Sequence, residues 1–439
     1  MWAAALTPQK LKCPVVVLVT ADRAVPGGVR PVALEIVVVA VPELAADIRK
    51  ISLEHQMLSA KKKNSKRPKF SPSLCVTHRC NLNCVYCYQQ HDINSRMSLE
   101  TAHQCLDWIF DNVPEGMQDV EIGFIGGEPF LEFPLMRDAI EYTLSRQRPH
   151  KFIFYATTNG TLLTPEIKDW CRKHKEIFVL ALSLDGAKDT HDHNRSNSFD
   201  RIDLDFFRDV YPLQSVKMTL TEYSLPRLAE NVKFVHQKGF KYIGGVNLCE
   251  GDFDWSKAEY IEILKQQLKE LSDFYVEHDD LPLNQMFDRH IDLCESSRRE
   301  YKKWCGIGDG AIFFDVDGKR YPCPFATPMT FSPEEMSDIL KTDFQDPMRF
   351  IDKECYDSCY IYPVCPTCAA ANYLTEKTFG RRDKRRCELQ KLITLFVADT
   401  LARRIVKNPR CMPPDKAYYT VQAIKKIRAL YLDGARKWG

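Results

Sequence analysis

The chain has 439 residues, of which 44% are apolar and 27% are charged, and its formal net charge is +2. This composition is typical of a globular protein with two or three domains, and it neither favours nor excludes a nucleic-acid partner. No apolar run reaches the roughly 20 residues that a membrane span needs, and residues 1–12 lack the pattern of a signal peptide. We therefore expect a cytoplasmic protein in which the 17 cysteines serve mainly metal or cluster binding instead of disulfides.

Residues 1–68 form the first predicted unit. Two β-branched runs, Pro14–Val19 and Val32–Val41, indicate strands, and Glu43–Ile51 has the pattern of a short amphipathic helix. The basic stretch at 61–69 is typical of a linker. We expect this unit to be a small extension that packs on the next domain.

Residues 69–250 alternate between strand-like and helix-like segments. The predicted strands are Ser73–Thr77, Asp119–Ile125, Lys151–Thr157, Phe178–Ser183, Val216–Leu220 and Tyr242–Val246. The helices predicted between them are Ser98–Asn112, Pro134–Arg146, Pro165–His174, Arg201–Val210 and Pro226–Lys238. Units of this kind form parallel sheets with right-handed crossovers. We therefore expect an α/β fold, a partial (β/α)6 barrel that carries its chemistry at the carboxyl ends of the strands.

Three further units are predicted after the barrel. Residues 251–304 form a helical bridge with helices at Lys257–His278 and Asn284–Lys303, residues 305–390 are rich in cysteine, and residues 391–439 form basic helices. Between Glu376 and Gly439 there are 17 Lys and Arg residues against 6 Asp and Glu residues. Such a tail is most often a solvated face, and a docking surface for an acidic peptide is the alternative.

The loop after the first barrel strand carries three closely spaced cysteines, Cys80, Cys84 and Cys87, in a C-x3-C-x2-C pattern. Three thiolates at this spacing can bind three irons of a [4Fe–4S] cluster and leave the fourth iron open for chemistry. A zinc knuckle or three core cysteines are the alternatives. A structural zinc site needs a fourth ligand, for which His78 is the nearby candidate.

Three polar motifs follow later strands of the predicted barrel. They are Gly126-Gly127-Glu128-Pro129, Thr158-Asn159-Gly160 and Ser183-Leu184-Asp185-Gly186. Each is common in ordinary turns when it stands alone. Their position after successive strands places all three beside the cysteine loop at one end of the barrel.

The cysteine loop, with the aromatic Tyr86 before its last cysteine, and the three motifs together resemble the radical S-adenosylmethionine (radical SAM) superfamily. The resemblance implies that S-adenosylmethionine chelates the open iron and is cleaved to methionine and a 5′-deoxyadenosyl radical, which abstracts a hydrogen atom from the substrate. It also implies that the Gly126–Pro129 motif holds the methionine amino group. The motifs that contain Asn159, Ser183 and Asp185 are expected at the same cofactor, with the last two at its ribose and methionine end.

Individual residues near these motifs carry narrower expectations. Because Gly127 lacks a Cβ, we expect it to let the backbone approach the methionine closely. Arg195 resembles a family arginine and is expected to pair with the methionine carboxylate, with a surface ion pair as the alternative. We interpret His191 and His193 as polar residues of an exposed loop, and no general base stands out.

The cysteine-rich region has a ligand pattern of its own. Cys305 and Cys323 flank an Asp-Gly turn, which predicts a β-hairpin that brings the two thiols together. Further along the chain lie Cys355, Cys359, Cys365, Cys368 and Cys387. A zinc ribbon is the alternative to iron–sulfur binding.

This region resembles the SPASM extension of radical SAM enzymes, although it has x3 then x2 around its x5 spacing where the family has x2 then x3. The resemblance implies two auxiliary [4Fe–4S] clusters. The first takes Cys305, Cys323 and Cys368, and the second takes Cys355, Cys359, Cys365 and Cys387. Either Cys294 completes the first set or an iron stays open for a substrate thiol. We interpret most remaining cysteines as buried apolar side chains, namely Cys13, Cys75, Cys105, Cys171, Cys249 and Cys411.

Relatives with this architecture act mainly on peptides and proteins, so the resemblance implies a peptide maturase. The preferred function is thioether cross-linking of a precursor peptide, with flavodoxin or ferredoxin as the electron donor. Carbon–carbon cross-linking and formylglycine formation in sulfatases are the alternatives. A leader-peptide recognition role for residues 1–68 is a less favoured interpretation. A zinc-binding scaffold that recruits nucleic acid through the basic helices is the non-enzymatic alternative.

Overall fold

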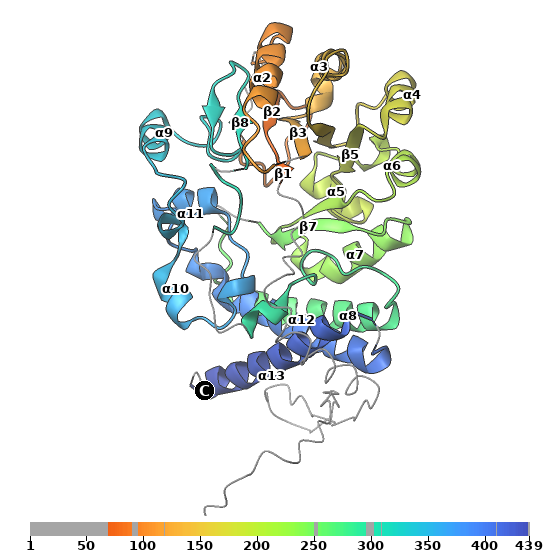
Figure 1. The fold of residues 1–439 in the computed structure, drawn as a ribbon. Helices are drawn as coiled ribbons and strands as arrows, with labels where there is room; N and C mark the ends of the chain where they lie inside the picture. Colours follow the sequence, from red (N-terminus) through yellow and green to blue (C-terminus); the bar gives the residue numbers. More distant parts are fainter. Residues whose placement is uncertain are drawn as a thin grey trace, which may run out of the picture.

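The computed structural model of the chain describes residues 69–89, 95–117, 119–249, 253–295, 303–308, 310–409 and 411–437. The extension predicted at residues 1–68, with its two strands and its helix, lies outside these ranges. The described part joins a sheet with its covering helices, a cysteine-rich region and a layer of long helices (Figure 1).

A largely parallel sheet forms the centre of the fold. Its hydrogen-bonded order is β5-β4-β3-β2-β8-β9, and β1 also pairs with β3. β6 and β7 pair in parallel with each other, and the bridge between Ser183 and Lys217 joins them to the end of β5. The strands of these units are β1 (Lys69–Phe70), β2 (Ser73–Thr77), β3 (Asp119–Gly126), β4 (Lys151–Thr158), β5 (Phe178–Leu182), β6 (Val216–Leu220) and β7 (Ile243–Leu248). The predicted α/β fold with a parallel sheet is confirmed.

The predicted helices cover the sheet, and one further short helix, α5 (Lys188–Asn194), forms where the sequence indicated a loop. The predicted ones are α2 (Leu99–Asp111), α3 (Phe133–Leu144), α4 (Pro165–His174), α6 (Leu204–Val210) and α7 (Leu228–Gln237). The side chains of Ser98, Thr164 and Asp203 cap α2, α4 and α6 by accepting backbone N–H groups of the first turn. All positions of β2 are buried, as expected for a strand that is covered on both faces.

The helical bridge differs from the prediction. α8 (Ala258–Glu277) is present, but residues 284–290 contain only a turn at 285–287, and a short 3-10 helix, η4 (Ile291–Cys294), follows. The buried side chain of Asn284 accepts hydrogen bonds from the N–H groups of Met286 and Phe287. Because these local bonds compete with helical ones, the predicted helix start at Asn284 is wrong. Residues 296–302 of that range lie outside the described part of the chain.

The C-terminal helices pack on the core with their apolar side, while basic side chains such as Lys407, Lys416 and Lys425 are exposed, as expected for a solvated face. α12 (Cys387–Lys407) packs against both α8 and α13 (Pro414–Lys437) at the bottom of Figure 1. Arg404 is buried, and its guanidinium donates hydrogen bonds to the carbonyl oxygens of Tyr275 and Leu281. Part of the positive charge that the sequence places in this segment is therefore internal.

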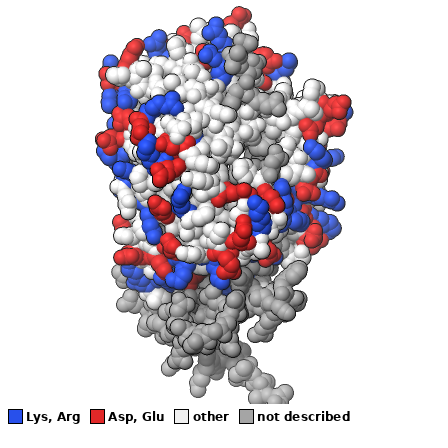
Figure 2. All heavy atoms as spheres, turned by 180° about the vertical axis from the view of Figure 1, so that it is seen from behind, with Lys and Arg blue, Asp and Glu red and all other residues white. Residues whose placement is uncertain are grey.

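The surface charge is mixed. Figure 2 shows Lys and Arg interleaved with Asp and Glu around the rim of the rear face, with uncharged side chains in its middle. Within the described ranges, no helix is long and apolar enough to span a membrane.

The cysteine-rich region packs beside the edge of the sheet. Its hairpin, β8 (Phe313–Phe314) and β9 (Arg320–Tyr321), adds to β2, with Ser73 opposite Phe313. Gly318 has φ of 78°, which the predicted Asp-Gly turn requires. The helices of this region are α9 (Pro333–Leu340), η5 (Pro347–Phe350), α10 (Lys353–Ser358), η6 (Tyr362–Val364), α11 (Ala369–Glu376) and η7 (Lys384–Arg386). A separate hydrophobic cluster that includes Ile307, Phe331 and Ile339 holds the region together.

Candidate functional site

The loop after β2 brings Cys80, Cys84 and Cys87 together. It is held from outside, because the N–H of Val85 donates to the carbonyl oxygen of Asn194 at 3.0 Å. Burial raises the pKa of the Cys80 thiol to about 11, and Glu128 and the two neighbouring thiols add to this shift. Three thiols that oppose each other's ionisation need a bound cation to become thiolates together. The loop therefore fits a metal or an iron–sulfur cluster.

A cavity of about 360 Å³ opens beside the cysteine loop. This volume is within the usual range for small-molecule sites. Besides the three cysteines, its lining includes Tyr86, Gly126, Gly127, Glu128, Asn159, Ser183 and Arg195. The structure thus brings one or more residues of every predicted cofactor motif to one cavity. Pro129 is instead buried at the start of η1 (Pro129–Glu132).

Gly127 makes a close contact within the protein, and its contact with the methionine stays a prediction. A Cβ placed on Gly127 would meet the carbonyl oxygen of Arg79 and the Cβ of Cys80 at separations far below van der Waals contact. The N–H of Glu128 donates to the same Arg79 oxygen at 2.8 Å. The absence of a side chain at Gly127 therefore allows the loop after β3 to pack directly on the first cysteine of the cluster loop.

Glu128 ties two of the motifs together. Its carboxylate accepts hydrogen bonds from the Asn159 N–H and the Thr158 hydroxyl, each at 2.7 Å. Burial raises the pKa of Glu128 to about 6, against the lowering effect of these bonds. The glutamate side chain therefore fixes the end of β4 beside the cysteine loop.

Asp185 anchors Tyr86 and Arg195. Its Oδ2 accepts hydrogen bonds from the Tyr86 hydroxyl at 2.8 Å and from Arg195 Nε at 3.0 Å. Its Oδ1 accepts the N–H of Thr219 at 3.0 Å. Arg195 is buried, so the surface ion pair considered for it is wrong. Asp185 therefore holds in place Tyr86 and Arg195, which both line the cavity. Both of its carboxylate oxygens already accept hydrogen bonds from other residues of the protein.

Arg195 also favours ionised thiols in the loop. Burial raises the pKa of both Cys84 and Cys87, and the guanidinium charge opposes that rise. A cation at this place stabilises thiolate ligands, which is the form that binds iron.

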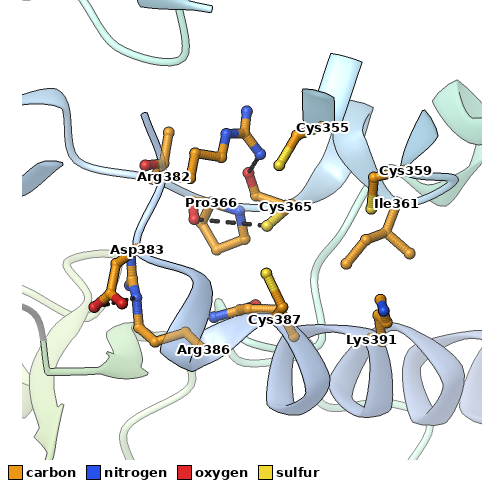
Figure 3. A pocket seen from close by; sticks show the side chains of 12 residues that line it. Cys355, Cys359, Ile361, Cys365, Pro366, Arg382, Asp383, Arg386, Cys387 and Lys391 are labelled. Carbon is orange, nitrogen blue, oxygen red and sulfur yellow. Dashed lines mark hydrogen bonds and ion pairs between the residues drawn. The ribbon is translucent and has the colours of Figure 1, made fainter. Parts of the chain in front are cut away.

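Four cysteines of the second constellation surround one pocket. Cys355 lies in α10, Cys359 follows that helix, Cys365 follows η6, and Cys387 begins α12. In Figure 3 their sulfur atoms face a common space. This is the ligand set that the resemblance implies for the second auxiliary cluster, and a donor set of four thiols suits an iron–sulfur cluster or zinc.

The remaining cysteines of the constellation lie nearer the cavity beside the cysteine loop. Cys323 and Cys368 pack against the hydrophobic cluster that contains Ile307. Ile307 lies two residues after Cys305 in the chain. Burial raises the pKa of the Cys323 thiol to about 11, and the Cys305 thiol adds to this shift. Pro324, next to Cys323, lines the cavity beside the cysteine loop.

Tyr88 and Phe325 connect this corner to the cluster loop. Their rings stack with centroids 4.3 Å apart. Tyr88 follows the last cysteine of the loop, and Phe325 lies two residues after Cys323. Neither ring stood out in the sequence, because only the fold brings the two segments together.

Cys294 lies elsewhere in the molecule. It is buried in η4, which packs against η6 and α13. The thiols of Cys365 and Cys294 both interact electrostatically with the guanidinium of Arg289. Cys294 is thus placed toward the second cysteine set rather than between Cys305 and Cys323.

Two further sequence interpretations can be compared with the structure. Cys75, Cys105, Cys171 and Cys249 are buried as predicted, whereas Cys411 is exposed, and Cys13 lies outside the described residues. His191 is not in an exposed loop but is fully buried in α5. Its ring bonds the Ser198 hydroxyl at 2.9 Å, and its Nδ1 lies 3.4 Å from the Asp185 N–H.

Comparisons with known proteins agree with the cavity and its motifs. Residues 74–204 match the family model of the radical SAM superfamily. An uncharacterized protein of Methanocaldococcus jannaschii is 28% identical over 261 residues, which cover 57% of this chain and 83% of the relative. The cysteine-type anaerobic sulfatase-maturating enzyme of Clostridium perfringens is 26% identical over 275 residues, covering 56% of this chain and 71% of the enzyme.

A solved structure shares the fold. Native anSMEcpe with bound AdoMet superposes with a TM-score of 0.60 at 18% sequence identity, over 78% of this chain and 100% of the other. At this level of identity the likeness concerns the fold alone.

Proposed function

Because this chain is an enzyme of the radical SAM superfamily, we propose that it is a peptide maturase that closes a thioether bond in a precursor peptide. The cluster at Cys80, Cys84 and Cys87, with S-adenosylmethionine, supplies a 5′-deoxyadenosyl radical that abstracts a hydrogen atom from the peptide. The proposal assigns residues 69–250 to a partial (β/α)6 barrel and residues 305–390 to a SPASM-type region.

The chain's own residues prepare this chemistry. Arg195 favours thiolates at Cys84 and Cys87, and Asp185 holds Arg195 and Tyr86 against the cavity. Glu128 fixes the end of β4, so that Asn159 lines the same cavity. We assign cofactor binding to the cavity lining and a positioning role to Asp185.

The observation that favours a polypeptide substrate is the wall that the cavity shares with the cysteine-rich region. Pro324 lines the cavity and directly follows Cys323, and Tyr88 of the cluster loop stacks on Phe325. A peptide held at the cavity therefore lies beside Cys323. A relative whose name states that it matures sulfatases adds support for a polypeptide substrate.

The preference for a thioether rests on the cysteine count in this corner. Cys305, Cys323 and Cys368 supply three thiols, and Cys294 lies toward the other set. Three protein ligands leave room for a substrate thiol as the fourth. Formylglycine formation is the second candidate, because the Clostridium perfringens relative is named a sulfatase-maturating enzyme.

The test uses anaerobically reconstituted chain, a flavodoxin or ferredoxin as reductant, and precursor peptides encoded beside its gene. We expect about 12 iron atoms per chain, and about eight after Cys80, Cys84 and Cys87 are together changed to Ala. That variant should make no 5′-deoxyadenosine. If it kept all its iron and still cleaved S-adenosylmethionine, the assignment of the radical-generating site would be wrong.

Mass spectrometry of the peptide separates the candidate products. A thioether removes a pair of hydrogen atoms and leaves a cysteine that no longer reacts with iodoacetamide. A carbon–carbon cross-link removes the same pair but leaves every cysteine reactive. Formylglycine replaces the thiol sulfur by a carbonyl oxygen and would identify a sulfatase maturase instead.

A further inference from the structure

Lys384 makes direct contact with a sulfur atom of the four-cysteine site (Cys355, Cys359, Cys365 and Cys387). Its Nζ lies 2.9 Å from Cys355 Sγ. Lys384 begins η7, and the thiol belongs to α10, so the contact joins two segments that are 29 residues apart. An ammonium that donates to a ligand sulfur is a charge-assisted hydrogen bond.

A buried carboxylate fixes this contact. Asp352 Oδ1 caps α10 by accepting the N–H of Cys355 at 3.0 Å, and its Oδ2 lies 3.1 Å from Lys384 Nζ. The same Oδ2 accepts the N–H of Arg382 at 2.9 Å. Asp352 therefore fixes Lys384, Cys355 and the backbone of Arg382 relative to one another.

Other cations surround the same pocket. Arg382, Arg386 and Lys391 line it, and Lys391 interacts electrostatically with the thiols of Cys359 and Cys387. Figure 3 shows Arg382 reaching over Cys365, whose carbonyl oxygen it bonds at 3.2 Å. The Nε of Arg382 is buried and has no acceptor among the described residues. These features fit an anionic group held by the four thiolates.

We propose that Lys384 raises the reduction potential of an iron–sulfur cluster held by the four cysteines and so fits that cluster to accept an electron. A cluster gains one negative charge on reduction, and its potential depends on nearby charge and on hydrogen bonds to its sulfur ligands. A positive donor at Cys355 Sγ stabilises the reduced form more than the oxidised one.

The inference rests on the proposed function, which requires an electron acceptor. When the radical takes a hydrogen atom from a peptide carbon and a cysteine sulfur bonds to that carbon, the thiol releases its proton and one electron remains. An oxidised [4Fe–4S] cluster at the four-cysteine site takes up that electron, and the flavodoxin or ferredoxin can receive it afterwards.

The test is a redox titration of the anaerobically reconstituted full-length chain, followed by electron paramagnetic resonance. The relevant signal is the one that disappears in a Cys359→Ala, Cys365→Ala double variant. In Lys384→Met the midpoint potential of that signal should shift to more negative values, with unchanged iron content. Lys384→Arg should keep the wild-type potential, and Lys384→Gln, which keeps a donor without the charge, should lie between.

Lys353→Met is the matched control. Lys353 lies in α10, the helix that carries Cys355, and pairs with Asp357, and its side chain is 85% exposed. Its loss removes the same charge from an exposed position on the helix of Cys355, so the potential should stay close to wild type. Equal potentials for Lys384→Met and the wild type would overturn the inference while leaving the cluster assignment intact. If the double cysteine variant lost no iron and no signal, the four-cysteine cluster itself would be refuted.

Discussion

Nε2 of His78 lies 2.6 Å from Oδ1 of Asp315, although 237 residues separate the two in the chain. His78 stands two residues before Cys80, and Asp315 follows β8 in the hairpin that leads to Cys323. Asp315 also accepts the N–H of Val316 at 2.8 Å. The pair thus connects the loop of Cys80, Cys84 and Cys87 to the cysteine-rich region.

Asp315→Ala should destabilise the protein. It removes one partner of a largely buried histidine, and the loss of a hydrogen bond at a buried polar group costs about 1–3 kcal/mol. Chemical unfolding under anaerobic conditions measures the loss. Asp317→Ala is the control, because Asp317 lies in the same hairpin turn but is about half exposed, with a side-chain exposure of 47%. Equal stability of the two variants would show that the His78 contact contributes little.

The sequence predicted local features better than long-range ones. The strands and the Asp-Gly turn were predictable, because hydrophobic patterning and turn chemistry act over a few residues. The contact between His78 and Asp315, the stack of Tyr88 on Phe325 and the sulfur contact of Lys384 depend on tertiary structure and leave no local pattern. The helix predicted from Asn284 was wrong for a local reason. The side chain of this one residue bonds the backbone N–H groups of Met286 and Phe287, and these bonds compete with the helix that the pattern of several residues predicted.

Gly127→Ala should remove the radical-generating cluster along with activity. The new Cβ would collide with the backbone of Arg79 and with Cys80, which is a proposed ligand. We expect iron to fall from about 12 to about eight atoms per chain and 5′-deoxyadenosine production to stop. Gly306→Ala is the control, because its Cβ would meet its nearest neighbour, the N of Ala311, at 3.5 Å. A Gly127→Ala chain with full iron content but no activity would instead favour the predicted methionine contact.

Cys294→Ala should keep both the iron content and peptide cross-linking, because Cys294 lies toward the second cysteine set. Cys305→Ala should lose cross-linking and still produce some 5′-deoxyadenosine, since the proposed site at Cys80, Cys84 and Cys87 is intact. Iron analysis and mass spectrometry of the peptide measure the two effects. Loss of iron from Cys294→Ala would mean that the first cluster is fully ligated by the protein, and the thioether preference would then be no stronger than the carbon–carbon alternative.

His191 should make the protein less stable in mild acid. Burial lowers the pKa of His191 to about 4, from 6.5 for the ordinary side chain. The folded protein therefore binds fewer protons than the unfolded chain, so this contribution is complete above pH 6.5 and is lost as the pH falls toward 4. From pH 7.5 to pH 5 the free energy of unfolding should drop by about 2 kcal/mol through this group. Urea unfolding of His191→Gln should lack that drop, because an amide can replace both hydrogen bonds without titrating. His193→Gln, at the exposed neighbouring histidine, should behave as the wild type, and an unchanged pH dependence in His191→Gln would contradict the assignment.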